Sequence, residues 1–526
     1  MAVNTAGPCD PERHYMLPPE PRLPEARGLI ERGLYFVVHA PRQTGKTTTL
    51  RALARRLTAE GRFAALHFSC QSAASAGEDL VWAQDFVLHA MRRRAEIDLP
   101  PELRPPDHWS DLPRGRQLYE ALTVWAQTCP RPLVLFFDEI DSLSGQSLLS
   151  VLHQLREGYE VRPSSFPGTV VLCGLRDVRD YKAASGGDPG RLGTASPFNI
   201  TVASLRLGDF TEADVRALYA QHTDETGQPF TEEALARAWE YTAGQPWLVN
   251  ALAAEVVDGM KVPLTEPITA DHIDIAKERL ILARATHLDS LLARLHEPAV
   301  RRVLEPLIAG DLPADGDETF DDDVSYTRDL GLIAPGKPLR IANPIYREVI
   351  VRVLGSRTEE VITAQPRSFV LPDGRLDFDR LLREFAEFWR ANGDVLAARD
   401  AYHEAAPHLV IMAYFHRLIN GGGFIDREYG IGMRRIDLLV RWPYRDADGR
   451  PAVQRQAVEL KIWAKGAEDP LHEGLVQLDD NLHRLGLDHG TLVIFDRRPT
   501  AAPIADRLRF DVVSTPSGRK VTLLRA

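Results

Sequence analysis

The chain has 526 residues, of which 44% are hydrophobic and 26% charged, a composition typical of a globular protein with several domains. Its net charge of −11 excludes a protein that binds nucleic acid over its whole surface, although a local basic groove is compatible with this charge. The cysteines Cys9, Cys70, Cys129 and Cys173 form no CxxC pair, which indicates reduced thiols rather than a disulfide or zinc framework. No apolar run is long enough to cross a membrane and no signal-peptide core is visible, so we expect a cytoplasmic protein with no membrane partner.

The first part of the chain is predicted to form a parallel sheet covered by helices. A Pro-rich entry to about residue 25 leads into the apolar strand "LYFVVHA", and strands and helices then alternate to about residue 200. Helical spacing follows, and then a helix, short strand, turn, strand and helix that look like a winged helix, with "APGK" as the wing tip. The predicted parts are a core over 1–204, a helical lid over 205–268, a winged helix over 269–355, a helical linker over 356–400 and a terminal domain over 401–526.

A phosphate-binding loop is the most specific pattern in the sequence. In "LYFVVHAPRQTGKTTTL" an apolar strand runs into a loop of small residues that ends at Gly45, Lys46 and Thr47, and an amphipathic helix follows. Such a loop surrounds a β-phosphate with backbone N–H groups, the lysine reaches the phosphates, and the threonine hydroxyl binds Mg²⁺. Ala40 stands where the strict pattern has glycine. The predicted nucleotide-binding residues are Ala40, Pro41, Arg42, Gln43, Thr44, Gly45, Lys46, Thr47, Thr48 and Asp138.

An acidic pair after a second apolar strand completes this prediction. In "PLVLFFDEIDSL", Asp138 would help to hold Mg²⁺ and Glu139 would polarise the attacking water. A third strand ends near Cys173 and Gly174 with no evident polar γ-phosphate sensor. Arg176 and Arg179 come next, as an arginine finger or as surface ion-pair partners.

These residues resemble the AAA-like ATPases of prokaryotes, in particular the branch close to the archaeal ATPases and the STAND group. The loop "RQTGKTTTL", "FFDEID", "SPFNI" and "YTAGQPWLVN" carry the resemblance, which extends over roughly residues 10 to 355. It implies a P-loop NTPase fold, ATP with Mg²⁺ as cofactors, homo-oligomerisation, and a lid held near the nucleotide by Gly244, Gln245 and Pro246. The winged helix in this branch either contacts DNA or packs against the nucleotide domain.

Two carboxylates near the C-terminus are predicted to converge. In "RRIDLLV", Asp437 is flanked by aliphatic residues, and in "VELKIW", Glu459 and Lys461 share one face of a strand. A solvated cross-strand pair is the ordinary explanation of the second motif. If the strands are neighbours, however, the two carboxylates face the same way and need a cation between them, and a divalent metal fits. Glu404 is a further candidate ligand, and Gln477 a candidate for positioning water.

The order of helix, three strands, helix and strand over residues 401 to about 500 resembles the PD-(D/E)xK nuclease superfamily. The resemblance implies an α/β restriction-endonuclease-like domain in which the strand "TLVIFD" closes the sheet. It also implies Mg²⁺- or Mn²⁺-dependent cleavage of DNA by Asp437, Glu459, Lys461 and Gln477. Arg427, Arg434 and Arg435 contact phosphates or lie on the surface.

Three functions are open at this point. The first is an ATP-regulated nuclease acting on DNA in defence or DNA processing. The second is a signalling ATPase whose terminal domain only binds nucleic acid or a partner. The third is a transcription regulator that acts through the winged helix.

Overall fold

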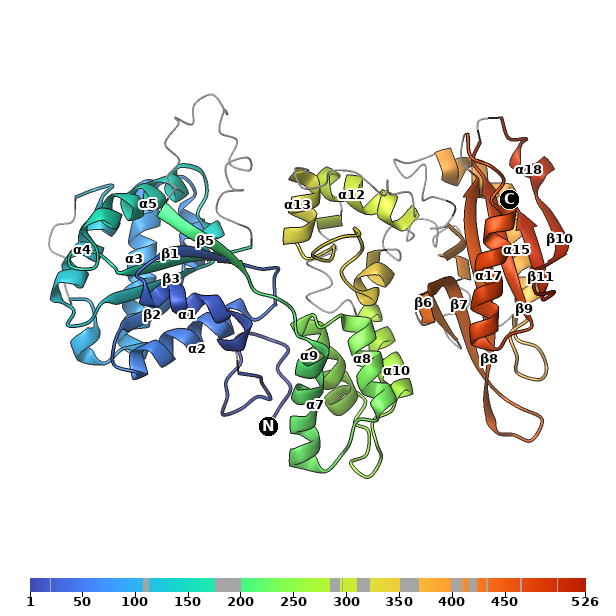
Figure 1. The fold of residues 1–526 in the computed structure, drawn as a ribbon, viewed down its shortest axis with the longest axis horizontal. Coiled ribbons are helices and arrows are strands. Elements are labelled where there is room, and N and C mark those ends of the chain that lie inside the picture. Colours follow the sequence, from blue (N-terminus) through green and yellow to red (C-terminus); the bar gives the residue numbers. More distant parts are fainter. Residues whose placement is uncertain are drawn as a thin grey trace. The chain divides into compact units, whose positions relative to one another are not determined.

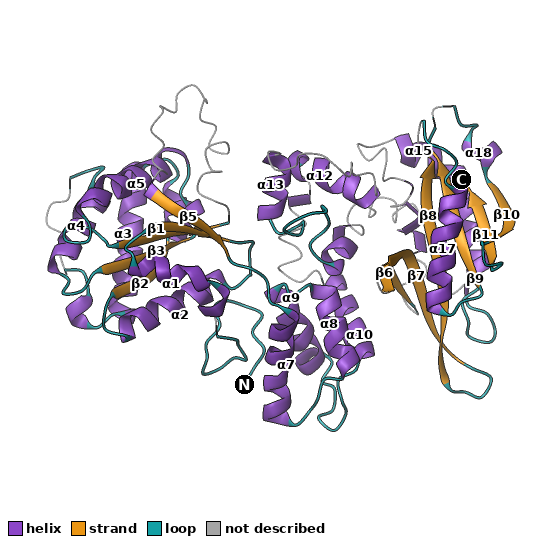
Figure 2. Ribbon diagram, viewed as in Figure 1, coloured by secondary structure: helices purple, strands orange, loops and turns teal. Residues whose placement is uncertain are grey.

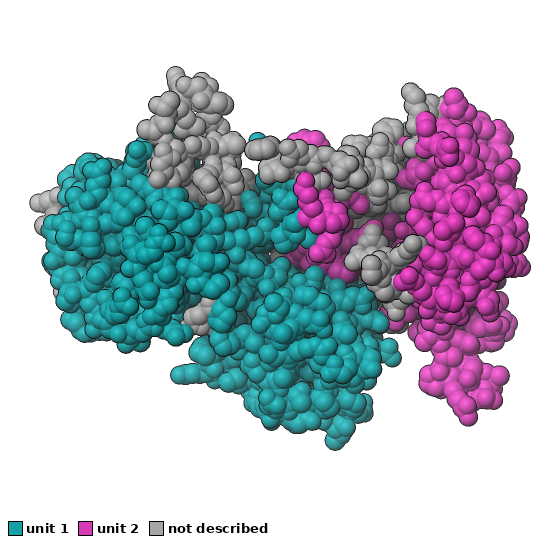
Figure 3. All heavy atoms as spheres, viewed as in Figure 1, with its two compact units in different colours: residues 1–289, 318–336 teal, residues 290–317, 337–526 magenta. Residues whose placement is uncertain are grey.

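The computed structural model divides the chain into two compact units, residues 1–289 with 318–336 and residues 290–317 with 337–526 (Figure 3). Each unit holds its own β-sheet (Figure 1). Among the described helices, none combines the length and the apolar character that a membrane crossing requires. The structure describes all residues except 19, 107–112, 176–199, 284–293, 296, 310–321, 351–368, 399–406, 408–409, 413, 416–422, 432–433, 464–465 and 499.

The first unit is built on a sheet of five parallel strands in the order β2-β3-β4-β1-β5, which confirms the predicted parallel sheet. The strands are β1 (Tyr35–His39), β2 (Ala64–Ser69), β3 (Leu133–Asp138), β4 (Thr169–Gly174) and β5 (Thr201–Arg206). β1 to β4 are buried along most of their length, as expected of strands covered on both faces. Their carboxyl ends therefore bring residues from distant parts of the sequence to one edge.

Helices cover both faces of this sheet (Figure 2). On one face α1 (Pro24–Glu31) and α2 (Lys46–Ala59) pack against β1 and β3. The other face is covered by α3 (Leu80–Asp98), α4 (Gln117–Thr128) and α5 (Gly145–Gly158). The two apolar layers hold the sheet rigid, so the loops at its carboxyl edge start from fixed positions.

Four helices follow the sheet in the first unit. They are α7 (Glu212–Thr226), α8 (Glu232–Thr242), α9 (Pro246–Ala254), which continues as a short π-helical turn, and α10 (Ala270–Leu282). α7 begins with a capping box between Thr211 and Asp214, which satisfies two N–H groups at the start of the helix. Their role as a lid over a nucleotide stays a prediction.

The region predicted to be a winged helix falls on both units. It contains α12 (Pro298–Ala309), α13 (Asp322–Asp329) and a helical stretch at 344–350. Where two wing strands are predicted, the described residues form single bridges at Ile333 and Ile341. The winged helix and the predicted domain boundaries therefore stay predictions.

The second unit is built on a mixed sheet of six strands in the order β10-β11-β9-β8-β7-β6. They are β6 (Phe424–Ile431), β7 (Arg434–Arg445), β8 (Pro451–Trp463), β9 (His489–Asp496), β10 (Arg509–Ser514) and β11 (Lys520–Arg525). The prediction that the strand "TLVIFD" closes the sheet is wrong, because β11 pairs with β9 on the side away from β8. The short alternating segments after residue 508 carry this extra hairpin.

Helices lie on both faces of the second sheet. α17 (Leu471–Leu485) packs against β7, β8 and β9 through Leu478 and Leu482. On the other face α15 (Phe378–Ala398) places Trp389 against Phe495 of β9, with ring centroids 5.3 Å apart. A one-turn helix, α18 (Ile504–Arg507), leads into β10. The odd-numbered residues of β8, which include Glu459 and Lys461, therefore share the face that α17 covers.

Candidate functional sites

The loop between β1 and α2 adopts a conformation suited to binding phosphate. Gln43 and Gly45 both have positive φ, 58° and 85°, and such backbone turns expose successive N–H groups. α2 begins directly after Gly45, so its N-terminus points at the same place. Lys46 Nζ donates to the carbonyl oxygens of Ala40 and Pro41 at 2.7 and 2.8 Å. Burial lowers the pKa of Lys46, although nearby carboxylates offset part of this effect.

The acidic residue at the end of β3 lies beside this loop. Thr47 Oγ1 donates to Asp138 Oδ2 at 2.7 Å, and His67 Nε2 of β2 lies 2.9 Å from the same oxygen. Burial raises the pKa of Asp138, but the contacts with His67 and Thr47 outweigh burial and leave the pKa below its usual value. A hydroxyl and a carboxylate held together in this way fit a hydrated Mg²⁺ ion.

Glu139 lies next to Asp138 in a left-handed backbone conformation, with φ of 55°. Its carboxylate accepts a hydrogen bond from the Ser69 hydroxyl, which lies at the end of the neighbouring strand β2. This contact holds the proposed base in one orientation. Neither His67 nor Ser69 is predicted from the sequence, because their approach depends on β2 lying beside β3.

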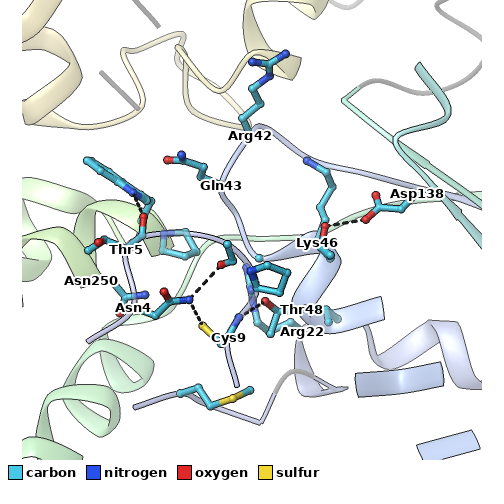
Figure 4. Close-up of a pocket in the computed structure, with 18 of the residues that line it drawn as sticks. Asn4, Thr5, Cys9, Arg22, Arg42, Gln43, Lys46, Thr48, Asp138 and Asn250 are labelled. Atoms are coloured by element: carbon cyan, nitrogen blue, oxygen red, sulfur yellow. Dashed lines mark hydrogen bonds between the residues drawn. The ribbon is translucent and has the colours of Figure 1, made fainter. Parts of the chain in front are cut away.

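A cavity of about 480 Å³ opens over the loop (Figure 4). It is bordered by the N-terminal segment, by the loop and by α9. We call residues 1–17 the N-terminal strap. The strap is attached to α2 through Cys9 N, which donates to Thr48 Oγ1 at 3.1 Å, and to α9 through Trp247 Nε1, which donates to the carbonyl of Thr5 at 2.9 Å. The strap thus covers a cavity large enough for a nucleotide.

Arg22 is a further residue of this cavity that the sequence does not single out. Its guanidinium lies 4.9 Å from the ring centroid of Phe210, and one nitrogen donates to the carbonyl of Gly208. A Cβ built on Gly45 would lie 3.0 Å from the Arg22 side chain, so the guanidinium touches the phosphate loop. Burial lowers the pKa of Arg22 to about 10, with partial compensation by acidic neighbours, and the group stays cationic at neutral pH.

The start of α9 contacts the loop from the other side. Gln245 Nε2 donates to the carbonyl of Gln43 at 3.5 Å, and its Oε1 accepts from Leu248 N at the start of the helix. Gly244 has φ of +78°, and a Cβ built there would lie 1.9 Å from the carbonyl oxygen of Phe210. The turn before α9 therefore requires glycine.

Gly244→Ala is expected to destabilise the first unit by about 3 kcal/mol or more, because the new methyl group must displace backbone. Gly227→Ala is the matched control, since Gly227 has the same φ of +78° but no atom within 4 Å of a built Cβ. The control should cost only about 1–2 kcal/mol, the strain of a left-handed alanine. Thermal unfolding of both variants measures the difference, and equal losses would contradict the clash.

No polar γ-phosphate sensor is predicted at the end of β4, where Cys173 stands. Cys173 is buried at the end of β4, and burial, followed by the charge of Asp138, raises the pKa of its thiol well above the ordinary value. It therefore remains a neutral thiol near the phosphate loop. Arg176 and Arg179 lie outside the described residues.

The second unit brings together Asp437, Glu459 and Lys461. In the antiparallel strands β7 and β8, Leu438 lies opposite Val458. Asp437 and Glu459 are the next residues along the two strands, so their side chains project from the same face of the sheet. Asp437 Oδ2 accepts from Leu460 N at 2.8 Å, and Lys461 Nζ lies 3.5 Å from Glu459 Oε1.

Glu459 is 3% exposed, and its Oε2 has no hydrogen-bond partner among the described residues. Burial, and then the charge of Asp437, raises the pKa of Glu459 to about 8, although Lys461 opposes the shift. A buried carboxylate oxygen without a partner, beside a second carboxylate, is suited to binding a cation.

Two residues of α17 reach Lys461. Gln477 Oε1 accepts a hydrogen bond from its ammonium, and Glu473 Oε1 lies 3.4 Å away. Glu404 and the side chains of Arg427, Arg434 and Arg435 lie outside the described part of the chain. Within the part described, no group of three His, Cys, Asp or Glu side chains could hold a metal ion, so this pair of carboxylates would need a backbone carbonyl, water or substrate as additional ligands.

The unfolding free energy in chelator is expected to fall as pH rises from about 5 to 8. The folded pKa of Glu459, about 8, lies above its ordinary value of 4.5, so the folded protein keeps a proton that the unfolded chain has lost. Each pH unit in this window then costs at most about 1.4 kcal/mol. Urea unfolding of the wild type and of Glu459→Gln across this range tests the effect. Equal pH dependence in both proteins would refute it.

A match to a known protein family agrees with the first site. Residues 30–181 match the AAA domain family. No curated protein matches the chain. A Walker-type ATPase of Pyrococcus abyssi matches with 13% identity over 66% of this chain and 99% of that one, with a TM-score of 0.46. The RuvB Holliday junction branch migration motor of Thermotoga maritima matches with 15% identity over 63% of this chain and 92% of that one, with a TM-score of 0.32. Cdc6p of Pyrobaculum aerophilum matches with 12% identity over 64% of this chain and 94% of that one, with a TM-score of 0.35. The domain match and the loop geometry identify an AAA-like P-loop ATPase domain that binds ATP.

Proposed function

We propose that this protein is an ATP-regulated, metal-dependent nuclease that acts on DNA. The single observation that carries the nuclease half is the buried oxygen of Glu459 that lacks a partner, next to Asp437 and Lys461. A cation or a proton relieves such a site, and two strand carboxylates followed by a lysine are able to support metal-dependent phosphodiester hydrolysis.

In this proposal each side chain of the site has its own role in phosphodiester hydrolysis. Asp437 and Glu459 would hold Mg²⁺ or Mn²⁺, which would supply Lewis-acid stabilisation of the charge on the phosphate. Lys461 donates to the same phosphate oxygens as negative charge develops. Gln477, which now bonds to Lys461, orients the lysine and accepts from water.

The ATPase half has its own support in the first unit. The phosphate loop, Thr47 with Asp138, and Glu139 supply the groups that bind MgATP and polarise water. A bound nucleotide would contact the loop, the strap and α9 together, because all three border the same cavity. The predicted oligomer and any DNA contact of the first unit remain part of this proposal.

A segment of the first unit supports regulation. A Cβ built on Gly331 would lie 2.7 Å from the Pro41 ring in the phosphate loop, and Asp329 lies 3.9 Å from His39. Arg206, at the end of β5, donates to the carbonyl of Arg328 at 3.2 Å. The segment leads directly into residue 337, where the second unit resumes. A movement of the loop on nucleotide binding would therefore also move the polypeptide that leads into the second unit.

The test is cleavage of linear and supercoiled DNA by the full chain with Mg²⁺ or Mn²⁺, with and without ATP. We expect metal-dependent products in the wild type and none in Asp437→Asn, with Asp448→Asn, an exposed residue of the β7–β8 turn, as control. Calorimetry should show Mn²⁺ binding that Asp437→Asn weakens. Equal cleavage by wild type and Asp437→Asn would refute the site.

The second candidate function is a signalling ATPase whose terminal unit binds nucleic acid or a partner but does not cut DNA. The observation that favours it is that only two acidic ligands gather among the described residues of the second unit. It predicts ATP-dependent association with nucleic acid or a partner, and no cleavage product with either metal. A transcription regulator would instead keep sequence-specific DNA binding in Asp437→Asn and show no cleavage in the wild type.

A further inference from the structure

Strand β10 (Arg509–Ser514) forms one edge of the sheet in the second unit (Figure 1). It pairs with β11, and no other described strand borders it. Its side chains are nearly all exposed, including Phe510 at 41% and Val512 at 66%. Exposed aromatic and β-branched residues on a free edge are the features by which strands pair with another chain.

The free edge presents its hydrogen-bonding groups outward. At the end of the hairpin Thr515 N donates to the carbonyl of Arg519 at 2.9 Å, so this pair is a hydrogen-bonded one. Such pairs alternate along an antiparallel ladder. The N–H and C=O groups of Arg509, Asp511 and Val513 therefore point to β11, and those of Phe510, Val512 and Ser514 point away from it.

The charges on this strand are complementary to those of a second, antiparallel copy of the same strand. Arg509 and Asp511 lie on one face, and Arg509 Nε is 3.2 Å from Asp511 Oδ2. Both side chains remain largely exposed, at 65% and 45%. A two-fold axis that passes between two antiparallel copies of this strand at Phe510 places each arginine opposite the aspartate of the other copy.

Only some registers are compatible with these facts. Because the outward groups belong to even-numbered residues, an even-numbered residue must lie opposite an even-numbered one. A register centred on Asp511 would place two aspartates face to face, and one centred on Val512 would form no charge pair. The register centred on Phe510 forms two Arg509–Asp511 pairs and places the two phenylalanine rings together.

We propose that β10 pairs antiparallel with β10 of a second copy of this chain, with Phe510 opposite Phe510, and so joins the two six-stranded sheets into one. The proposal does not depend on ATP binding or on nuclease activity. It also accounts for the exposure of Phe510 and Val512, which the second copy would cover.

The groove beside β10 favours a second copy over nucleic acid. It has a volume of about 430 Å³ and lies between α15 and the residues Leu508 and Phe510. Its helical side carries charges of both signs, from Arg380, Arg383, Glu384, Glu387 and Arg390. Arg380 pairs with Glu384 and Arg390 with Glu387, which leaves a net charge of only +1 from Arg383. A polyanion is bound through several uncompensated cations, and this groove does not offer them.

Charge reversal tests the pairing and its register. We expect Arg509→Asp and Asp511→Arg each to weaken self-association of the full, nucleotide-free chain about tenfold, because like charges then oppose one another twice. The double variant R509D/D511R should associate as the wild type does. A mixture of the two single variants should form heterodimers, since both cross-strand pairs become attractive. Sedimentation over a dilution series measures each case.

A cross-link tests the same geometry without relying on charge. Under mild oxidation Phe510→Cys should form a disulfide-linked dimer, because the two Cα atoms would lie about 5.5 Å apart. Val453→Cys, 54% exposed on β8, is the matched control and should remain unlinked. A monomeric wild type throughout the dilution series would overturn the proposal. Dimers unaffected by either charge reversal, and lacking the Phe510→Cys disulfide, would also overturn it.

Discussion

Lys46→Ala is expected to abolish tight MgATP binding, with a loss of at least about a hundredfold in affinity, or roughly 3 kcal/mol. The ammonium lies at the centre of the phosphate loop and bonds to the carbonyls of Ala40 and Pro41. An arriving phosphate offers the same cation stronger, charged acceptors. Without it, the loop keeps its backbone N–H groups but loses the one ammonium group at its centre, which Arg22 at the edge of the loop does not replace.

Calorimetric titration of the full chain with MgATP measures this loss. Lys520→Ala, an exposed lysine of the second unit that does not line the cavity, is the control and should bind as the wild type does. Circular dichroism should show that both variants are folded. Wild-type affinity in Lys46→Ala would mean that the nucleotide binds elsewhere, and the assignment of the loop would fail.

Lys461→Ala is expected to reduce DNA cleavage by about a thousandfold, the effect of removing a charged donor aimed at the transition state. Lys461 lies 3.5 Å from Glu459 and is held by Gln477 and Glu473, so its ammonium is fixed beside the carboxylates. Because lysine is not a metal ligand, Mn²⁺ binding should change little. This pattern differs from Asp437→Asn, which is expected to lose binding and cleavage together.

The control is Lys520→Ala, an exposed lysine at the start of β11 in the same sheet. Cleavage of a fluorescent duplex and calorimetry with Mn²⁺ give the two measurements. Retained cleavage in Lys461→Ala would remove the lysine from the mechanism. Loss of Mn²⁺ binding in that variant would instead show that it supports the fold of the site.

The sequence predicts best those features that are contiguous. The phosphate loop is recognisable because strand, loop and helix follow one another within a few residues, from β1 to Lys46. The parallel sheet of the first unit follows from the alternation of apolar strands and helices. Local patterns of this kind need no knowledge of how distant segments pack.

Contacts across strands are harder to predict. His67 and Ser69 lie in an apolar strand, "AALHFS", and their contacts with Asp138 and Glu139 follow only from the order in which β2 and β3 pair. Arg22 comes from the chain before β1 and reaches the loop through packing against Phe210. The hairpin of β10 and β11 is not predicted from the sequence. The side chains of β10 are nearly all exposed, and the place of β11 in the sheet follows only from its pairing with β9.

The N-terminal strap has a kinetic consequence. A nucleotide in the cavity lies under a polypeptide attached on one side to Thr48 and on the other to Trp247. We expect release of a bound nucleotide to require the strap to move, so opening of the strap and release of the nucleotide should occur together.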